Sequence, residues 1–410
     1  MTFEELYRTM LKQAVERGSV QADDLEASAG HLDCLLHPQD HPLVWPLNPC
    51  TCPKEETHCA AACLFDAIVR RDDGTLAVDP DRCSGCGACI QACQSGNLTA
   101  SRDVLPALDA VKHAKGPVYA LIAPAFLGQF STVVTPGRLR SAFKLLGFTG
   151  MVEVALFADL LTLKEALEFD RNIHTETDFQ LTSCCCPMWI GMIRKLYHEL
   201  MPHVPGAVSP MIAAGRTVKK LHPDAVTIFV GPCIAKKAEA READLAGAVD
   251  YVLTFQEMQD IFQAADIHPE LLEESERDHS SRAGRIYART GGVSEAVRTT
   301  VARLHPERPI QVRTRQADGV PACRAMIEDI RSGQHQANFF EGMGCTGGCV
   351  GGPKVLLDRE TGRENVDRYG DEAEFGTPLD NPYVLKLLRL LGFDTVEEFL
   401  EQSDIFIRHF

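Results

Sequence analysis

Four cysteines near the N-terminus have a spacing that is typical of iron–sulfur ligands. The stretch CSGCGACIQAC follows the pattern C-x2-C-x2-C-x3-C, and its cysteines are Cys83, Cys86, Cys89 and Cys93. The small residues between them let the backbone wrap around a cubane and point its amides at the sulfides. The run therefore predicts ligands for a 4Fe-4S cluster.

A second group of cysteines lies just upstream. NPCTCPKEETHCAAAC supplies Cys50, Cys52, Cys59 and Cys63 in a C-x-C-x6-C-x3-C spacing. In two-cluster ferredoxins the fourth cysteine of a C-x2-C-x2-C-x3-C run binds the other cluster, so we expect the two groups to exchange their fourth ligands. One 4Fe-4S cluster would take Cys63, Cys83, Cys86 and Cys89. The other would take Cys50, Cys52, Cys59 and Cys93.

Eight cysteines could instead form two zinc sites, because C-x2-C pairs also suit tetrahedral zinc. The three-cysteine run C-x2-C-x2-C favours clusters over zinc. Two cubanes this close together are suited to passing electrons.

Composition narrows the class of protein. The chain has 410 residues, which is enough for two or three domains, and 16 cysteines. It shows no signal-peptide pattern and no run near the roughly 18 to 20 apolar residues of a spanning helix, so we expect a cytoplasmic protein. In that compartment many cysteines indicate metal binding rather than disulfides. The formal net charge of −16 disfavours nucleic acid or an anionic membrane as the main partner.

From about residue 112 apolar strands alternate with amphipathic helices, as in GPVYALIAPAF, TPGRLRSAFKLLGF and AVTIFVGPC. This alternation predicts an α/β domain, in which sites form beyond the carboxyl ends of strands. Cys233 directly follows such a strand. In TSCCCPMW the three cysteines at 184–186 precede a predicted helix, whose N-terminal dipole favours a thiolate. We expect both segments to supply metal ligands.

A third segment, FFEGMGCTGGCVGGPK, places Cys345 and Cys349 among the five glycines between Gly344 and Gly352. Glycine lets the backbone approach a large inorganic group and present amides to it. The segment lacks the G-K-S/T ending of a phosphate loop, which disfavours nucleotide binding. TGGVSEAV, residues 290–297, is interpreted as a glycine-opened helix that packs tightly.

These three segments resemble the signature motifs of the FeFe hydrogenases, TSCCP-x-W, PC-x2-K-x2-E and E-x-M-x-C-x3-C. The extra cysteine in TSCCCPMW suggests a divergent subgroup. The resemblance covers roughly residues 45–385 and implies an α/β catalytic domain, with two sheet-containing lobes around the active-site cluster, after a small α+β ferredoxin-like domain. The expected division is an N-terminal helical segment at 1–45, a ferredoxin-like domain with two 4Fe-4S clusters at 46–108, the catalytic domain at 109–385 and a helical tail at 386–410.

The family's active site is a 4Fe-4S cluster joined through one cysteine to a diiron unit that carries carbonyl, cyanide and an azadithiolate. The resemblance assigns the bridge to Cys349 and the whole set of cluster ligands to Cys186, Cys233, Cys345 and Cys349. It also places four residues around the diiron unit, which are Ser183, Pro232, Lys236 and Met343. Of these, Lys236 would donate a hydrogen bond to a cyanide ligand.

The resemblance also implies a proton path. Cys185 aligns with the proton-delivering cysteine, and a thiol suits that task because its surroundings can bring its pKa near neutrality. The alternative is a small buried hydrophobic residue. Glu165 and Glu168 lie on one helical face and align with two relay glutamates, although such residues alone are usually solvated. The family's relay serine falls at Pro205 or Gly206, and Ser209 matches only approximately.

Other positions depart from the family or carry no chemistry. Gly231 stands where a methionine usually precedes PC, which removes bulk near the diiron unit. Lys237 is expected to be a surface ion-pair partner of Glu239. Cys323 is interpreted as a core residue.

The resemblance implies the reversible interconversion of dihydrogen with protons and electrons. The N-terminal clusters would connect the active site to a ferredoxin-like carrier, and maturation proteins would insert the diiron unit. Two alternatives are a hydrogenase-like dihydrogen sensor and an iron–sulfur assembly protein without the diiron unit. Cys185, Lys236 and Met343 together argue against the assembly protein, because a scaffold needs none of them.

Overall fold

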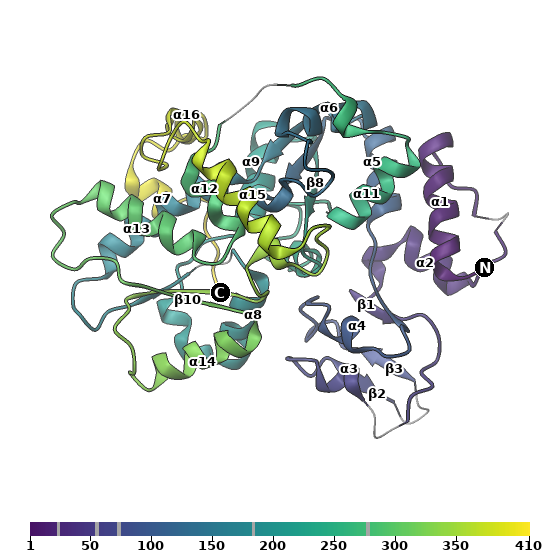
Figure 1. Ribbon diagram of the computed structural model, residues 1–410, viewed down its shortest axis with the longest axis horizontal. Coiled ribbons are helices and arrows are strands. Elements are labelled where there is room, and N and C mark those ends of the chain that lie inside the picture. Colours follow the sequence, from purple (N-terminus) through teal and green to yellow (C-terminus); the bar gives the residue numbers. More distant parts are fainter. Residues whose placement is uncertain (23–24, 54–56, 72–74, 183–184, 276–278) are drawn as a thin grey trace.

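The computed structural model describes the whole chain except residues 23–24, 54–56, 72–74, 183–184 and 276–278. Figure 1 shows a large α/β part and, at the opposite end of the long axis, two N-terminal helices above a small cysteine-rich part. Among the described residues, no helix is long and apolar enough to cross a membrane.

A four-stranded parallel sheet forms the centre of the large part. Its order is β6-β5-β8-β9, and its strands are β5 (Val118–Ile122), β6 (Gly150–Glu153), β8 (Val226–Gly231) and β9 (Tyr251–Thr254). Most of the residues in these strands are buried, as in a parallel sheet covered by helices on both faces. The predicted α/β fold is confirmed.

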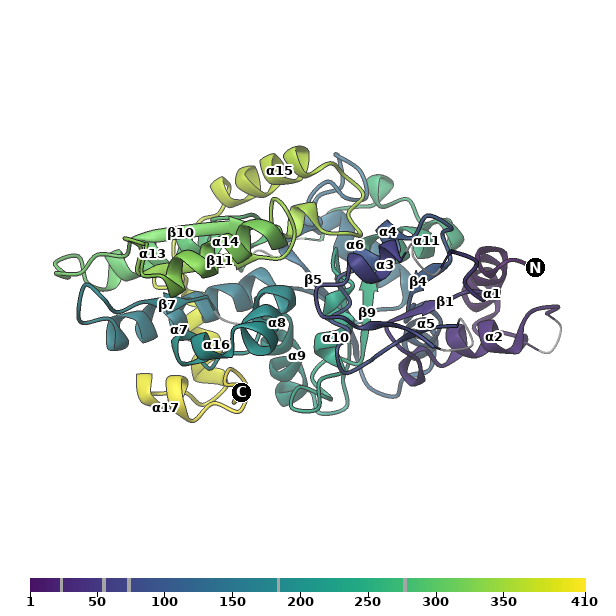
Figure 2. The same cartoon turned by 90° about the horizontal axis from the view of Figure 1, so that it is seen from below.

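A second parallel sheet lies beside the first, in the other lobe (Figure 2). Its order is β10-β11-β7, and its strands are β7 (Gln180–Leu181), β10 (Thr314–Asp318) and β11 (Phe339–Met343). The carboxyl ends of β8 and β11 are each followed, two residues later, by a cysteine of the predicted active site. The topology therefore brings distant segments to one place between the lobes.

Helices pack around and between the two sheets, and α7 contacts α9, α12, α13, α16 and α17. The longer helices of this part are α6 (Pro136–Leu146), α7 (Ala155–Asn172), α8 (Pro187–Leu196), α9 (Pro210–Leu221), α11 (Phe255–Ala264), α13 (Gly292–Leu304), α14 (Val320–Arg331), α15 (Arg359–Asp371) and α16 (Pro382–Leu390). The shorter ones are α10 (Ala235–Ala240), α12 (Arg282–Arg285) and α17 (Val396–Glu401).

Local sequence explains where several of these helices begin. Thr135 and Ser209 accept hydrogen bonds at the starts of α6 and α9, each followed by a proline at the first helical position. Thr254 and Glu257 form a reciprocal capping box at α11. At α13, an added Cβ on Gly292 would lie 1.8 Å from the Ile286 carbonyl oxygen, so this glycine allows the tight packing that was predicted.

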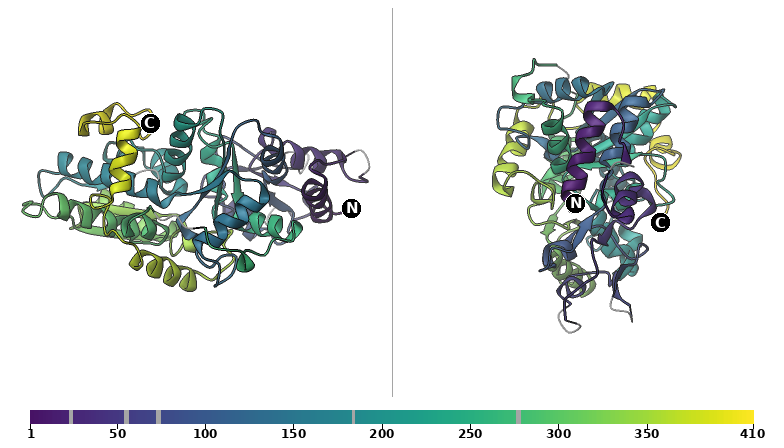
Figure 3. Two further views of the ribbon diagram at one scale, coloured as in Figure 1. Left: turned by 90° about the horizontal axis from the view of Figure 1, so that it is seen from above. Right: turned by 90° about the vertical axis from the view of Figure 1, so that its right-hand side faces the viewer.

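The small part consists of two antiparallel strand pairs and two short helices. The strands β1 (Val44–Pro46) and β4 (Leu98–Ala100) pair, as do β2 (Ile68–Arg70) and β3 (Leu76–Val78), and the helices are α3 (His58–Ala61) and α4 (Ala88–Ala92). The helix α5 (Val104–His113) leads into the large part. Figure 3 shows α1 (Phe3–Arg17) at the end of the molecule with α2 (Ala29–Leu36) beside it, and α1 packs against α5 and α11.

Candidate metal centre and catalytic cavity

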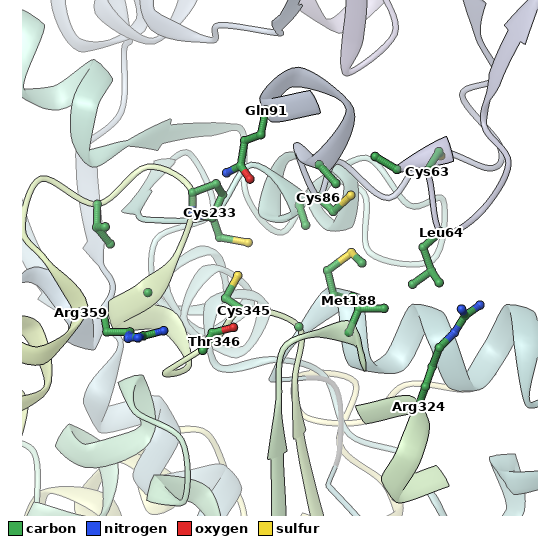
Figure 4. A pocket seen from close by; sticks show the side chains of 18 of the residues that line it. Cys63, Leu64, Cys86, Gln91, Met188, Cys233, Arg324, Cys345, Thr346 and Arg359 are labelled. Atoms are coloured by element: carbon green, nitrogen blue, oxygen red, sulfur yellow. The ribbon is translucent and has the colours of Figure 1, made fainter. Parts of the chain in front are cut away.

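Four cysteines from three separate segments meet between the two lobes. Cys186 caps α8, and Cys349 begins the short helix η7 (Cys349–Gly351). The thiol of Cys345 interacts electrostatically with those of the other three, Cys186, Cys233 and Cys349. Figure 4 shows the sulfur atoms of Cys233 and Cys345 pointing into one pocket.

The chemistry of these thiols fits an iron–sulfur cluster. Burial, followed by the charge of a neighbouring cysteine, raises the pKa of Cys233 to about 11 and that of Cys349 to about 12. Without metal they would be protonated thiols, whereas iron stabilises the thiolates. Among the described residues no three His, Cys, Asp or Glu side chains are placed to hold a single metal ion. A cubane binds each cysteine at a different iron and so suits wider spacing better than one zinc does.

A narrow cavity lies directly beside Cys349. Its wall is mostly apolar and includes residues that directly follow strands of the four-stranded sheet, namely Ala123, Val154 and Pro232. Met343, at the end of β11, completes this wall. The polar groups that reach the cavity include Lys236 and the thiol of Cys185. Ser183 and Cys184 lie outside the described residues.

The two adjacent lysines of α10 have different surroundings. Lys236 lines the cavity, and its ammonium donates to Glu239 at 2.6 Å. Lys237 is 1% exposed and donates to the Val252 carbonyl oxygen and to Glu257. The expectation that Lys237 is a surface partner of Glu239 is therefore wrong, because α10 turns Lys237 into the protein interior and Lys236 takes Glu239.

Gly231 does not leave open space. An added Cβ would lie 2.6 Å from the ring of Phe229, which is 3% exposed and also lines the cavity. The expectation that this position removes bulk is wrong, since the phenylalanine ring fills the volume that a side chain would take.

We therefore expect Gly231→Ala to destabilise the protein by about 1–3 kcal/mol, because the methyl group overpacks a site bounded by a buried ring. Anaerobic urea unfolding would measure the change. Phe229→Leu with Gly231→Ala should recover part of the loss, whereas an alanine variant as stable as the wild type would contradict the packing described here.

The Cys185 thiol is partly buried at the cavity wall. Burial and then the nearby Glu165 carboxylate raise its pKa well above the ordinary value of 9.0. The expectation that the surroundings bring the pKa of Cys185 near neutrality is therefore wrong. The influences on this thiol come from carboxylates and other thiols, which raise its pKa. At neutral pH Cys185 carries its proton.

The two candidate relay glutamates lie on α7 and are both buried, at 1% exposure for Glu165 and 6% for Glu168. They are not solvated surface residues. Lys164, 1% exposed, donates to Glu168 at 2.6 Å and to the Leu400 carbonyl oxygen at 3.2 Å. Burial raises the pKa of Glu168, although Lys164 acts to lower it.

Ser209 has a structural role at the start of α9. Its hydroxyl accepts a hydrogen bond from the Ile212 backbone amide, and the side chain is fully buried. Cys323 is also fully buried, and its thiol donates to the Met343 carbonyl oxygen at 3.3 Å. Both residues serve packing and capping.

The N-terminal cysteines form two groups in space. The Cys89 thiol interacts electrostatically with those of its group, Cys63, Cys83 and Cys86. The other four line one small cavity, and they are Cys50, Cys52, Cys59 and Cys93. The structure thus brings together the residues that were expected to exchange fourth ligands.

Hydrogen-bond donors point at these thiols. The backbone amides of Ala67 and Asn97 donate to Cys63 and Cys93 at 3.2 and 3.3 Å. The Arg70 guanidinium donates to the Cys50 thiol at 3.3 Å. Hydrogen bonds of this kind to sulfur ligands help to set the reduction potential of an iron–sulfur cluster.

The first N-terminal group lies next to the active-site cysteines. Cys63 and Cys86 line the same pocket as Cys233 and Cys345, and the Cys86 and Cys345 thiols interact (Figure 4). The two N-terminal groups and the active-site group therefore follow one another from the surface inward, an order that suits electron transfer.

Comparison with protein families agrees with this geometry. The family profile described as "Iron only hydrogenase large subunit, C-terminal domain" matches residues 116–353. The chain belongs to this hydrogenase family. The profile described as "4Fe-4S binding domain" matches residues 76–99, so a ferredoxin-like 4Fe-4S domain precedes the hydrogenase domain. The family resemblance seen in the sequence is confirmed.

Two curated hydrogenases are similar to this member of the family. Iron hydrogenase 1 of Clostridium pasteurianum is 28% identical over 275 residues, which are 57% of this chain and 48% of the relative. The NADP-reducing hydrogenase subunit HndD of Solidesulfovibrio fructosivorans is 25% identical over 365 residues, 74% of this chain and 62% of the relative. The chain thus spans about half to three-fifths of the length of these relatives.

Solved hydrogenase structures share the fold. The FeFe-hydrogenase HydA1 of Chlamydomonas reinhardtii aligns with a TM-score of 0.62 and 21% identity, covering 75% of this chain and 98% of the solved one. At this identity the likeness shows the fold alone.

Three buried polar residues, two of them on α7, were not found from the sequence. In the sequence, Lys164 looks like an ordinary surface lysine just before the two candidate glutamates, and Thr162 and Tyr287 look like ordinary helix positions. Thr162 Oγ1 lies 2.8 Å from the hydroxyl of Tyr287, across 125 residues of sequence. The signal available for Lys164 was its apolar neighbours on α7, which indicate a helix buried on all sides.

Proposed function

We propose that this chain is an FeFe hydrogenase of a divergent subgroup that interconverts dihydrogen with protons and electrons. The observation that carries the proposal is one mostly apolar cavity beside four converging cysteines, into which the ammonium of Lys236 and the thiol of Cys185 both reach. An assembly scaffold needs the cysteines but not this cavity. The proposal keeps the division of the chain after residues 45, 108 and 385.

The residues around the cavity fit the family's active-site cofactor. Cys186, Cys233 and Cys345 would hold its 4Fe-4S part, with Cys349 shared with a diiron unit bearing carbonyl, cyanide and an azadithiolate. When bound, the diiron unit supplies the Lewis-acidic metal that polarises dihydrogen. Lys236, fixed by Glu239, offers an ammonium to an anionic ligand in the cavity.

The chain's own side chains would move the proton. Cys185 would hold a proton at the cavity wall, and the Glu165 carboxylate, whose charge acts on that thiol, would receive it. Glu168 would come next, three residues further along the same helix. Pro232 and Met343 keep the cavity apolar and exclude bulk water.

Electrons would travel through the two N-terminal 4Fe-4S clusters. The inner one, held by Cys63 with Cys83, Cys86 and Cys89, lies next to the active site, and the outer one would meet a ferredoxin-like carrier. Maturation proteins would deliver the diiron unit. The described cysteines form no disulfide, which suits the cytoplasmic location we propose.

One observation favours a second candidate, a dihydrogen sensor that turns over slowly. Glu168 is almost fully buried and ion-paired with Lys164, which restricts proton exchange with solvent at the outer end of the path.

An infrared spectrum would test the proposed function. Protein purified without oxygen and supplied with the diiron unit is compared under argon and under dihydrogen, in the carbonyl and cyanide stretching region. We expect bands that shift between the two gases. Protein that holds only 4Fe-4S clusters is the control and should show no such bands. If protein that was supplied with the diiron unit and holds complete 4Fe-4S clusters shows no such bands, the hydrogenase proposal is wrong. Bands that depend on the gas, together with negligible dihydrogen turnover, would favour the sensor.

A further inference from the structure

A hydrogen-bonded pair of hydroxyl groups begins at the wall of the catalytic cavity, with Tyr287, and has no part in the proton path described above. Tyr287 belongs to the short helix η6 (Ile286–Ala288), is 6% exposed and lines the cavity together with Cys185 and Met343. Its hydroxyl lies 2.8 Å from Oγ1 of Thr162 on α7. Tyr287 is thus a polar element in a wall made mostly of apolar side chains, and the fully buried Thr162 lies behind it.

The hydrogen bonds of Thr162 allow two arrangements. Its Oγ1 lies 2.8 Å from the Ala158 carbonyl oxygen and 2.8 Å from the Tyr287 hydroxyl. A threonine has one hydroxyl hydrogen and a carbonyl only accepts. In one arrangement Thr162 donates to Ala158 and Tyr287 donates to Thr162. In the other, Thr162 donates to Tyr287, whose own hydrogen is then available to another acceptor. Rotation of two hydroxyl groups interconverts them without backbone movement.

Three ionisable side chains act on the Tyr287 hydroxyl, namely Glu165, Cys185 and Asp159. Asp159 is engaged elsewhere, because it accepts hydrogen bonds from Ser281, Gly284 and Asn381. The other two are the members of the proposed proton path. The phenol therefore lies within electrostatic reach of both the proposed donor and the proposed acceptor.

Burial raises the pKa of Tyr287 well above 10, and the carboxylate of Glu165 adds to the effect. The phenolate is therefore not accessible near neutral pH, and Tyr287 can carry a proton only by giving one as it takes another. A hydroxyl that has both a donor and an acceptor partner can do this.

We propose that the Tyr287 hydroxyl, switched by Thr162, carries protons between Cys185 and Glu165. This inference rests on the proposed function. As the S–H bond of Cys185 breaks, the phenol oxygen takes that proton and the phenol hydrogen passes to a carboxylate oxygen of Glu165. The sum converts thiol and carboxylate into thiolate and carboxylic acid. Tyr287 is unchanged, and no electron is transferred.

Tyr287→Phe tests the proposal, because it keeps the ring and removes the hydroxyl. The first readout is the infrared S–H stretch of Cys185 in protein holding only the 4Fe-4S clusters, assigned by its loss in Cys185→Ala. We expect the band to move in Tyr287→Phe, since the phenol that is proposed to accept this proton is lost. The second readout is dihydrogen oxidation by the diiron-loaded protein, which should fall by about tenfold to a hundredfold with a larger solvent isotope effect.

Two further variants separate relay from packing. Thr162→Val is nearly isosteric and removes the switch, so it should move both readouts in the same direction. Tyr369→Phe is the matched control. The buried Tyr369 hydroxyl donates to Glu153 at 2.6 Å, and neither residue lines the cavity. It should leave both readouts unchanged.

The proposal stands only if both readouts respond in Tyr287→Phe. The proposal is overturned if the S–H band does not move in Tyr287→Phe. It is also overturned if the wild type oxidises dihydrogen and the variant keeps the same rate and solvent isotope effect. Failure of the proposed function is seen separately, in a wild-type protein that is loaded but inert.

Discussion

Cys185→Ala is expected to keep all its iron–sulfur clusters and to lose dihydrogen turnover by about a thousandfold, within the range of positioned proton-transfer groups. The thiol reaches a cavity whose wall is otherwise mostly apolar, and water cannot easily take its place. Its raised pKa keeps the proton on sulfur at neutral pH, so the thiol is ready to donate. An anaerobic assay of dihydrogen evolution with a reduced dye would measure the loss, beside an iron determination on the same sample.

Cys185→Ser sharpens this test. A serine hydroxyl has nearly the same shape but gives up its proton far less readily than a thiol, so we expect it to rescue little activity. Cys323→Ala is the matched control, because Cys323 is another buried thiol that interacts with Cys186 but does not line the cavity. It should stay within a few-fold of the wild type. If Cys185→Ala and Cys323→Ala were equally active, Cys185 would be a packing residue.

Those residues of the site that local structure positions could be predicted from the sequence. Cys233 and Cys345 follow the ends of strands, and Cys186 begins a helix, so each could be placed from a short segment and the rule that sites lie beyond strand ends. The spacing of the N-terminal cysteines was informative in the same way. The fold class was readable because alternating strands and helices leave a period in the sequence.

Tertiary partners could not be read from these segments. Phe229 and Gly231 share one face of β8, but whether the ring folds over Gly231 depends on the side chains that pack on that face. Lys237 looks like any lysine of a charged helix until α10 is docked on β9. Tyr287 meets Thr162 only because α7 and the η6 segment pack together. Burial of a polar group depends on the whole fold, which local patterns do not contain.

The ion pair of Lys164 and Glu168 should dominate the pH dependence of stability in this region. Lys164→Met removes one partner of a buried pair and leaves a carboxylate at 6% exposure, which costs about 3–5 kcal/mol of unfolding free energy near pH 8. Arg171→Met is the matched control on the same helix. Its pair with Glu401 is about half exposed, so its loss should cost less than about 1 kcal/mol.

The sign of the pH effect follows from the pKa of Glu168, which burial raises above its ordinary value of 4.5 while Lys164 lowers it. Because the folded protein then binds a proton more tightly than the unfolded chain, stability falls as pH rises from about 4.5 through the folded pKa. Lys164→Met removes the ammonium that lowers the pKa of Glu168, so in this variant the stability continues to fall up to a higher pH. Urea unfolding between pH 5 and 8 should show a deficit that grows with pH, and adding Glu168→Met should abolish that growth. A deficit that is the same at every pH would mean that Glu168 stays ionised without Lys164.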